Sequence, residues 1–210
     1  MKKVIYIHGL GGSGNGSSAQ NVKKLLGTQY EFSANTYDLL KPLEAFEQIK
    51  KDVKATKGTD IVIASSLGAF YASSVICPYV MLLLNPCLKP EYTIKHILYP
   101  EQRKDFDEEK CRHEWLEIKK NWDELDQEEK GERFGVFAKN DELFSFYETF
   151  KVHFGTFWGA RANSAFIEGT HEIAKDEAAL KKSLDLFWKY LDKTNEPMGK
   201  GLSASFDTLL

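Results

Sequence analysis

The sequence predicts an α/β protein built on a doubly wound, mostly parallel sheet of about six strands flanked by helices. Short apolar runs recur along the chain, and most are separated by segments of helical composition. The runs around Val4, Ile61 and Val80 are almost continuously apolar, as expected for strands that helices cover on both faces. The 210 residues, 42% of them hydrophobic, suffice for one substantial core. We therefore expect a single domain over residues 1–192 and a C-terminal tail over 193–210.

Each apolar, β-rich run is expected to form a strand. In chain order these strands are Val4–Ile7, Phe32–Tyr37, Ile61–Ala64, Val80–Leu84, Phe134–Ala138 and Ala165–Ile167. Segments of helical composition lie between and after them, and they are expected to be helices over Ala19–Leu26, Leu43–Ala55, Leu67–Ile76, Phe144–His153 and Lys175–Leu191. Pro42 suits the first turn of the second helix, because a proline lacks the N–H that would have no partner there.

The connection between the fourth and fifth strands is much longer than a plain crossover, which needs roughly one or two dozen residues. We expect a helical, cap-like insert there, over about residues 88–132 and ahead of the strand that leads to Asp141. Its apolar residues recur at steps of four and three along one helix face: Cys111, Trp115, Ile118, Trp122 and Leu125. This face either docks on the main body or forms a cap that shapes a substrate cleft.

The composition excludes several classes of partner. A formal net charge of −3, from 28 basic and 31 acidic residues, creates no field that favours nucleic acid or an anionic membrane. The longest apolar run, Tyr79–Leu84, is too short to span a bilayer, and no leader precedes Val4, so we expect a cytoplasmic protein. Three widely spaced cysteines (Cys77, Cys87 and Cys111) lack metal-site spacing and are expected to be reduced packing residues. No cofactor is expected, and the oligomeric state stays open.

The segment Ile61–Phe70 runs from a buried-strand pattern directly into a helical pattern, with two serines at the junction. A nucleophile elbow needs small residues two positions before and two after its serine, because the turn brings them against neighbouring backbone. Ser66 has Ala64 and Gly68 at these positions, whereas Ser65 would have two large aliphatic residues. Ser66 is therefore the candidate nucleophile, although alanine replaces the glycine with which such elbows usually begin.

A serine hydroxyl needs a base, and the base needs an orienting group. His171 and Asp141 each follow an expected strand after a short link, so both emerge at the carboxyl edge of the sheet, where Ser66 lies. The order Ser, Asp, His along the chain is that of an α/β-hydrolase catalytic triad. Two alternatives stay open for the acid: Asp141 could cap the helix expected near Phe144, and Glu142 is a second carboxylate.

Stabilisation of an oxyanion needs backbone N–H groups that point at the developing charge. One donor is expected from Leu67, at the N-terminus of the helix after the nucleophile. The second is expected from Leu10, because glycines leave little bulk around its amide. His8 and Gly9 in the same loop are expected to contact substrate, although a structural hydrogen-bonding role for the His8 ring is an equal alternative.

Five short motifs together resemble the small YqiA/YcfP-type bacterial esterases, over roughly residues 3 to 192. They are Tyr6-Ile7-His8-Gly9, Ala64-Ser65-Ser66-Leu67-Gly68, Asn85-Pro86, Asn140-Asp141-Glu142 and Gly169-Thr170-His171. The resemblance implies an α/β-hydrolase fold, carboxylesterase or thioesterase activity on small-molecule acyl substrates, no metal, and Ser66, Asp141 and His171 as the catalytic residues. Ala64, the insert and the tail depart from the family pattern.

Two other classes of function compete with this interpretation. The loop Gly9–Gly14 also fits the glycine pattern of a dinucleotide-binding site, and Asp38 follows the second strand as that motif requires. Against it, small residues continue through Ser18, so the helix starts too late to place its N-terminus against a pyrophosphate. The other alternative is a catalytically silent binding module that keeps a hydrolase fold.

Overall fold

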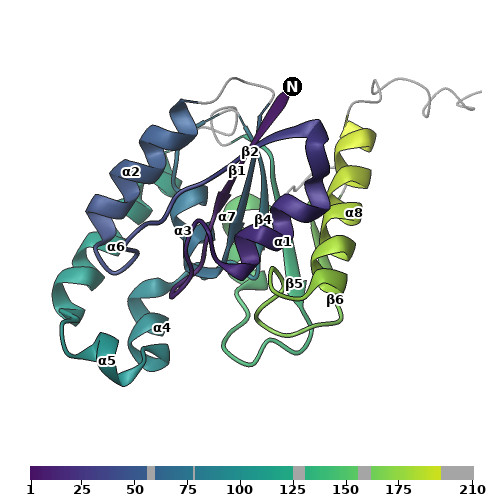
Figure 1. The fold of residues 1–210 in the computed structure, drawn as a ribbon. Coiled ribbons are helices and arrows are strands. Elements are labelled where there is room, and N and C mark those ends of the chain that lie inside the picture. Colours follow the sequence, from purple (N-terminus) through teal and green to yellow (C-terminus); the bar gives the residue numbers. More distant parts are fainter. Residues whose placement is uncertain (56–59, 78, 125–130, 156–161, 195–210) are drawn as a thin grey trace, which may run out of the picture.

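The computed structural model describes residues 1–55, 60–77, 79–124, 131–155 and 162–194. Within them one all-parallel sheet has the strand order β2-β1-β3-β4-β5-β6 (Figure 1). Its strands are β1 (Lys2–Ile7), β2 (Tyr30–Ala34), β3 (Ile61–Ser65), β4 (Val80–Leu84), β5 (Arg133–Ala138) and β6 (Ser164–Ile167). The predicted α/β class, the six-stranded parallel sheet and the doubly wound arrangement are confirmed.

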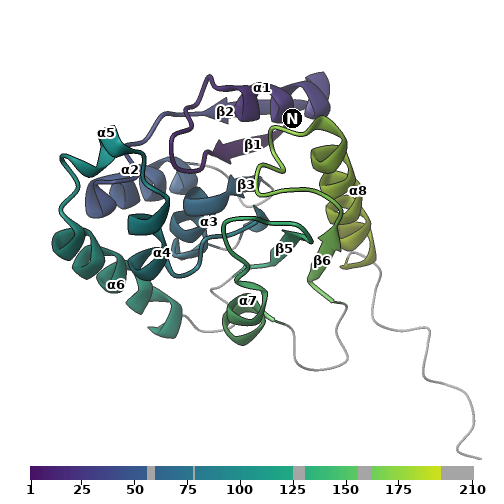
Figure 2. The same cartoon turned by 90° about the horizontal axis from the view of Figure 1, so that it is seen from below.

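Helices cover both faces of the sheet, as the continuous apolar strands predict (Figures 1 and 2). Helices α1 (Ser17–Leu26) and α8 (Glu177–Thr194) pack on one face. The other face is covered by α2 (Pro42–Lys54), α3 (Ser66–Ser73), α6 (Glu108–Glu124) and α7 (Tyr147–Phe154). The remaining helical segments are the 3-10 turn η1 (Gly27–Gln29), α4 (Pro90–Ile97) and α5 (Pro100–Arg103). Each face therefore has its own buried apolar core.

The strand order reverses beside β1, because the chain passes from β1 outward to β2 and then returns to β3 on the other side of β1. Helices α1 and α2, which make these two connections, accordingly lie on opposite faces. Open α/β sheets bind ligands in the crevice beyond the carboxyl ends of the strands at such a reversal. The ends of β1 and β3 therefore mark the place to look for a site.

Two element boundaries differ from the expected ones for reasons that the structure makes clear. The second strand was expected over Phe32–Tyr37, but β2 ends at Ala34 because the Tyr37 N–H donates to the ring of His8 rather than to a neighbouring strand. The helix expected from Phe144 starts only at Tyr147, because the Asp141 carboxylate accepts the N–H of Phe144 and holds the preceding turn. The other elements agree with prediction to within a few residues.

The insert ahead of β5 contains α4, α5 and α6, and its longest helix docks on the main body. Trp115 and Trp122 are 1% exposed, and their indole N–H groups donate to Tyr71 Oη at 2.8 Å and Ser74 Oγ at 2.7 Å. This contact favours the docked interpretation of the apolar face of α6. Leu125 and the tail over 195–210 lie outside the described residues, so the extent of the domain stays a prediction. All three cysteines are buried and free.

Candidate active site

Ser66 occupies a strained turn between β3 and α3. Its φ of 50° is left-handed, a conformation that is uncommon for residues other than glycine. Gly68 lies so close to the end of β1 that a Cβ atom there would be 2.2 Å from the His8 carbonyl oxygen. Ala64 is fully buried on the other side of the turn. Close backbone approach therefore requires the glycine at position 68, and the small Ala64 lies in a fully buried position.

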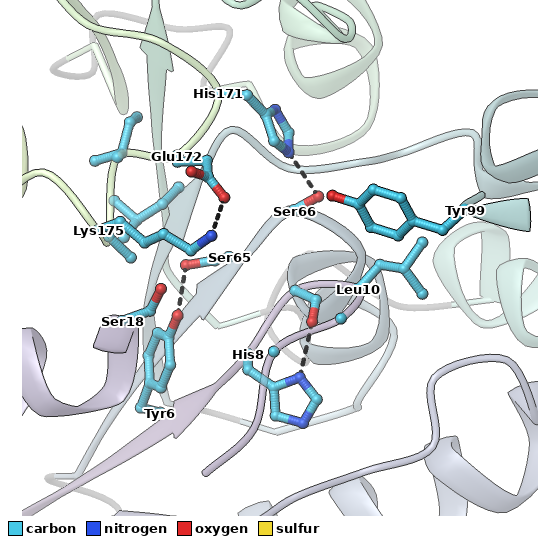
Figure 3. A pocket seen from close by; sticks show the side chains of 16 residues that line it. Tyr6, His8, Leu10, Ser18, Ser65, Ser66, Tyr99, His171, Glu172 and Lys175 are labelled. Atoms are coloured by element: carbon cyan, nitrogen blue, oxygen red, sulfur yellow. Dashed lines mark hydrogen bonds and ion pairs between the residues drawn. The ribbon is translucent and has the colours of Figure 1, made fainter. Parts of the chain in front are cut away.

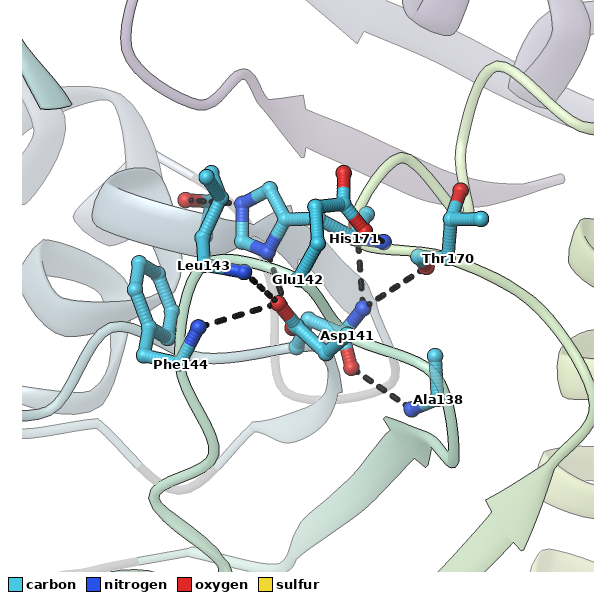
Figure 4. A network of polar contacts seen from close by, with 9 residues as sticks. Ala138, Asp141, Glu142, Leu143, Phe144, Thr170 and His171 are labelled. Atoms are coloured by element: carbon cyan, nitrogen blue, oxygen red, sulfur yellow. Dashed lines mark hydrogen bonds and ion pairs between the residues drawn. The ribbon is translucent and has the colours of Figure 1, made fainter.

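The His171 imidazole bridges Ser66 and Asp141. Its Nε2 lies 2.9 Å from Ser66 Oγ, and its Nδ1 lies 2.9 Å from Asp141 Oδ2 (Figures 3 and 4). The side chains of His171 and Asp141 are only 9% and 3% exposed, which keeps most water away from the pair. Residues that lie 105 and 30 positions apart in the chain are thus brought together at the carboxyl edge of the sheet.

Asp141 uses its two oxygens differently. Oδ1 accepts the backbone N–H groups of Leu143 and Phe144, at 2.9 and 3.1 Å, and so holds the turn that delays α7. Oδ2 is left to face the imidazole (Figure 4). Glu142, the alternative acid, instead accepts the backbone N–H of His171 at 3.0 Å. The two carboxylates therefore have different partners. Asp141 contacts the imidazole ring of His171, and Glu142 contacts the backbone of the loop that carries this ring.

A cavity of about 160 Å³ opens over Ser66 (Figure 3). Leu10 and Gly9 form part of its wall. A side chain at Gly9 would come within 3.0 Å of Ser66 Cβ and 3.7 Å of Ser66 Oγ, so glycine keeps the space above the hydroxyl open. Leu67 lies in the first turn of α3, where a backbone N–H has no carbonyl partner inside the helix. Both predicted oxyanion donors therefore belong to segments that border the hydroxyl.

The His8 ring is used inside the protein. It is 2% exposed, its Nδ1 lies 2.8 Å from the Gly9 carbonyl oxygen, and its Nε2 accepts the Tyr37 N–H at 3.0 Å. This pattern fits a neutral ring with its proton on Nδ1, and burial lowers the pKa of His8 below its ordinary value. Of the two roles expected for His8, the geometry favours the structural one.

Several residues that line the cavity have no predicted role in the site. Tyr99 points toward Ser66 from the segment before α5, and Glu172 and Lys175 form an ion pair at the opposite side (Figure 3). The Tyr6 hydroxyl lies 3.1 Å from Ser65 Oγ on the same wall as this ion pair. Tyr6 and Tyr99 reach the cavity from distant parts of the chain, whereas Glu172 and Lys175 follow His171 in one loop, so no single local pattern marks these residues.

The glycine loop that resembled a dinucleotide site contributes to the same cavity, and α1 begins only at Ser17. Asp38 accepts the Leu40 N–H and pairs with Lys41 on the exposed surface. In the described ranges, no group of three or more His, Cys, Asp or Glu side chains could hold a metal ion. None of the described helices combines the length and apolar character needed to cross a membrane.

The fold is similar to several solved structures. Est1E from Butyrivibrio proteoclasticus, with ferulic acid bound, has a TM-score of 0.58 and 12% identity, covering 92% of this chain and 90% of that one. A pyrethroid hydrolase from Sphingobium faniae has a TM-score of 0.57 and 13% identity, covering 91% and 99%. Mouse alpha/beta hydrolase domain-containing protein 10 has a TM-score of 0.56 and 17% identity, covering 91% and 90%. These likenesses show an α/β-hydrolase fold.

No curated protein sequence matches this chain. A family match covers residues 3–181, which is most of the chain, and the matching family is described as "Uncharacterised protein family (UPF0227)". The chain therefore belongs to the UPF0227 family, and it has an α/β-hydrolase fold.

Proposed function

We propose that this protein is a serine hydrolase that cleaves an acyl ester or thioester through an acyl-enzyme intermediate. The observation that supports this most directly is the continuous path of contacts from Asp141 through the His171 ring to Ser66 Oγ, each 2.9 Å long. A base within hydrogen-bond reach of a hydroxyl, itself oriented by a third group, is the arrangement that activates a serine nucleophile. The hydroxyl also faces a cavity that can admit a substrate.

In the first step Ser66 Oγ attacks the acyl carbonyl carbon while His171 Nε2 takes the hydroxyl proton. When the tetrahedral intermediate collapses, the bond to the alcohol or thiol breaks and His171 returns the proton to that leaving group. A water molecule then attacks the acyl carbon and gives a proton to His171. The bond to Ser66 Oγ breaks, the carboxylic acid is released, and Ser66 Oγ takes the proton back from His171. Asp141 accepts a hydrogen bond from the Nδ1–H throughout, which leaves Nε2 free to act as the base.

The negative oxygen of each tetrahedral intermediate would be bound by the backbone N–H groups of Leu67 and Leu10. Leu67 lies at the N-terminus of α3, where the helix dipole also favours negative charge. Gly9 leaves room for this oxygen because it has no side chain, whereas a side chain there would occupy the position above Ser66. His8 acts indirectly in this proposal, by tying the loop before Leu10 to Tyr37.

The size of the cavity limits the acyl group. Its volume of about 160 Å³ is below the roughly 300–1,000 Å³ typical of pockets for drug-sized ligands. The proposed substrate is therefore a small-molecule ester or thioester whose acyl part is short and whose leaving group extends toward solvent. Est1E, which is similar in fold, was solved with ferulic acid bound, and this supports a small carboxylic-acid derivative as the substrate class. The buried, unpaired cysteines fit action in a reducing compartment such as the cytoplasm.

A fluorophosphonate probe tests the proposal, because it reacts covalently only with an activated serine. The wild-type protein should be labelled, Ser66→Ala should not, and Ser65→Ala should still be labelled because Ser65 is bonded to Tyr6 rather than to the imidazole. Folding of all three proteins is checked by circular dichroism. A folded wild-type protein that does not react would contradict the proposal and favour a non-catalytic binding module.

Chromogenic esters and matched thioesters of graded acyl length then define the substrate. The cavity predicts the highest kcat/KM for the shortest acyl chains, with a decline once the chain exceeds the space over Ser66. Rising kcat/KM toward long chains would contradict the proposed restriction to short acyl groups but not the proposed mechanism.

A further inference from the structure

Asn85 is a buried polar residue in a costly backbone conformation, and the mechanism above gives it no role. It follows β4 directly, is 3% exposed and has a φ of 41°. In the described part of the chain, Ser66 and Asn85 are the two residues other than glycine with a positive φ. Strain of this kind persists only where the surrounding structure over-determines it, and it gathers at functional sites.

The Asn85 amide joins two loops that come from different strands. Its Nδ2 group donates to the carbonyl oxygens of Thr170 and His171, at 3.2 and 3.0 Å. Its Oδ1 accepts the N–H of Ala138, the last residue of β5, at 2.7 Å. Ala138 lies three positions before Asp141, so the Asn85 side chain holds both the loop of the imidazole and the strand end that carries the carboxylate.

The same turn also touches the nucleophile. The backbone N–H of Cys87 donates to the carbonyl oxygen of Ser66 at 3.0 Å. The Asn85 N–H itself donates to Val136 at 2.8 Å, which anchors the turn to β5. The segment 85–87 therefore bonds to the three chain segments that carry Ser66, Asp141 and His171. These bonds go to the backbone of the segments and not to the imidazole or the carboxylate.

We propose that Asn85 is a positioning residue that sets the distance between His171 and Asp141 and thereby the orientation of the imidazole toward Ser66. This inference rests on the proposed function for its effect on turnover. Asparagine suits the position because it tolerates left-handed backbone and offers two donors and an acceptor in one rigid plane. An error of about 1 Å in such a geometry costs about a hundredfold in rate.

The structure offers a matched control at the other end of the sheet. Asn163 is 5% exposed, and its Nδ2 also donates to two carbonyl oxygens, those of Arg133 at 2.9 Å and Phe154 at 2.7 Å. Asn→Asp at either position turns a donor into an oxygen that faces two carbonyl oxygens. Both variants should therefore lose thermal stability, but only one of them alters the site.

The test compares Asn85→Asp, Asn85→Gly and Asn163→Asp in the full chain. Glycine is included because it adopts the left-handed turn without strain while it removes the side chain that makes the three bonds. Both Asn85 variants should lower kcat by about ten- to a hundredfold with KM within about twofold, since misorientation affects the reacting atoms rather than binding. Asn163→Asp should leave kcat within about twofold of wild type at a temperature where it is folded.

A second measurement does not depend on turnover. The proton between His171 Nδ1 and Asp141 Oδ2 should give a far-downfield ¹H NMR resonance, identified by its loss in His171→Gln. This resonance should shift or broaden in both Asn85 variants and stay unchanged in Asn163→Asp. A wild-type protein without esterase activity would overturn the proposed function, while the resonance would still decide the positioning role.

Two results would overturn the inference about Asn85. One is a folded Asn85→Gly with wild-type kcat and an unchanged resonance. The other is that neither Asn85 variant folds under conditions where Asn163→Asp does, which would make Asn85 a requirement of the fold rather than a positioning residue of the site.

Discussion

Two regions of this protein contain buried hydrogen-bonded side chains, and they differ in what those bonds do. The first, the carboxyl edge, comprises Ser66, Asn85, Asp141 and His171. The second, the α3–α6 contact, comprises Tyr71, Ser74, Trp115 and Trp122. In the contact, both indole N–H groups donate to buried hydroxyls, and the Tyr71 hydroxyl donates to the Leu39 carbonyl oxygen.

The carboxyl edge adds two features that the α3–α6 contact lacks. Ser66 and Asn85 have left-handed backbone, whereas no described residue of the contact does. Ser66 and His171 also face a cavity, whereas the contact residues lie in the apolar core. The comparison teaches that burial with a hydrogen bond is not by itself a sign of function. Strain and access to a cavity distinguish the site, and both regions can be perturbed separately because they lie at opposite ends of α3.

The largest expected effect is on turnover, from Asp141→Asn. An amide facing His171 Nδ1 can donate to it and fix the wrong tautomer, so kcat should fall by about a thousandfold or more. Glu142→Gln is the matched control, because glutamine still accepts the His171 N–H, and its kcat should stay within about threefold. Steady-state kinetics check both. Equal losses in the two variants would show that the carboxylates do not divide their roles as proposed.

The effect of removing the proposed nucleophile on stability sharpens the comparison further. Ser66→Ala should abolish turnover. Its melting temperature should stay within roughly a few degrees of wild type, because the hydroxyl contributes one partly exposed hydrogen bond. Calorimetry of the folded variant checks this. A large drop in melting temperature would mean that the carboxyl edge stabilises the fold as strongly as the core does.

The opposite pattern is expected at the α3–α6 contact. Trp122→Phe removes the bond to Ser74 and some buried volume, so the free energy of unfolding should fall by about 1–3 kcal/mol. Its kcat should not change, because Ser74 lies beyond the C-terminal end of α3 while Ser66 begins it. The control is Leu116→Ala, on the exposed side of α6, which should lower the free energy of unfolding by less than about 0.5 kcal/mol. Denaturant titration measures both, and a change of kcat in Trp122→Phe would couple the two regions.

The smallest expected effect concerns pH and His8. Burial lowers the pKa of His8 in the folded state, so below its ordinary value of 6.5 the unfolded chain binds the proton first. The stability that His8 contributes is therefore present above about pH 6.5 and is lost as pH falls through the lower folded pKa. His8→Gln should therefore narrow the difference in melting temperature between about pH 7.5 and about pH 5.5, and an unchanged difference would contradict this role of His8.

The sequence by itself determined the fold class, and it reduced the candidate site to a few residues. Continuous apolar strands between helical segments predict a parallel sheet, and a parallel sheet sends every strand's carboxyl end to one edge. The size of the residues flanking Ser66 distinguished it from Ser65, and the positions of Asp141 and His171 after strands predicted that all three meet. These are consequences of local pattern and of sheet geometry.

Tertiary structure decided the rest. In the sequence, Asn85 stood out only as part of a family motif. Its three hydrogen-bond partners lie 53 to 86 positions away, and the strand order β4-β5-β6 brings them to it. The end of β2 at Ala34 and the inward role of His8 depend on a single bond from Tyr37. Periodicity reports which face of an element is buried, but it does not report which buried polar groups will pair. That pairing follows from strand order and register, which distant parts of the chain set together.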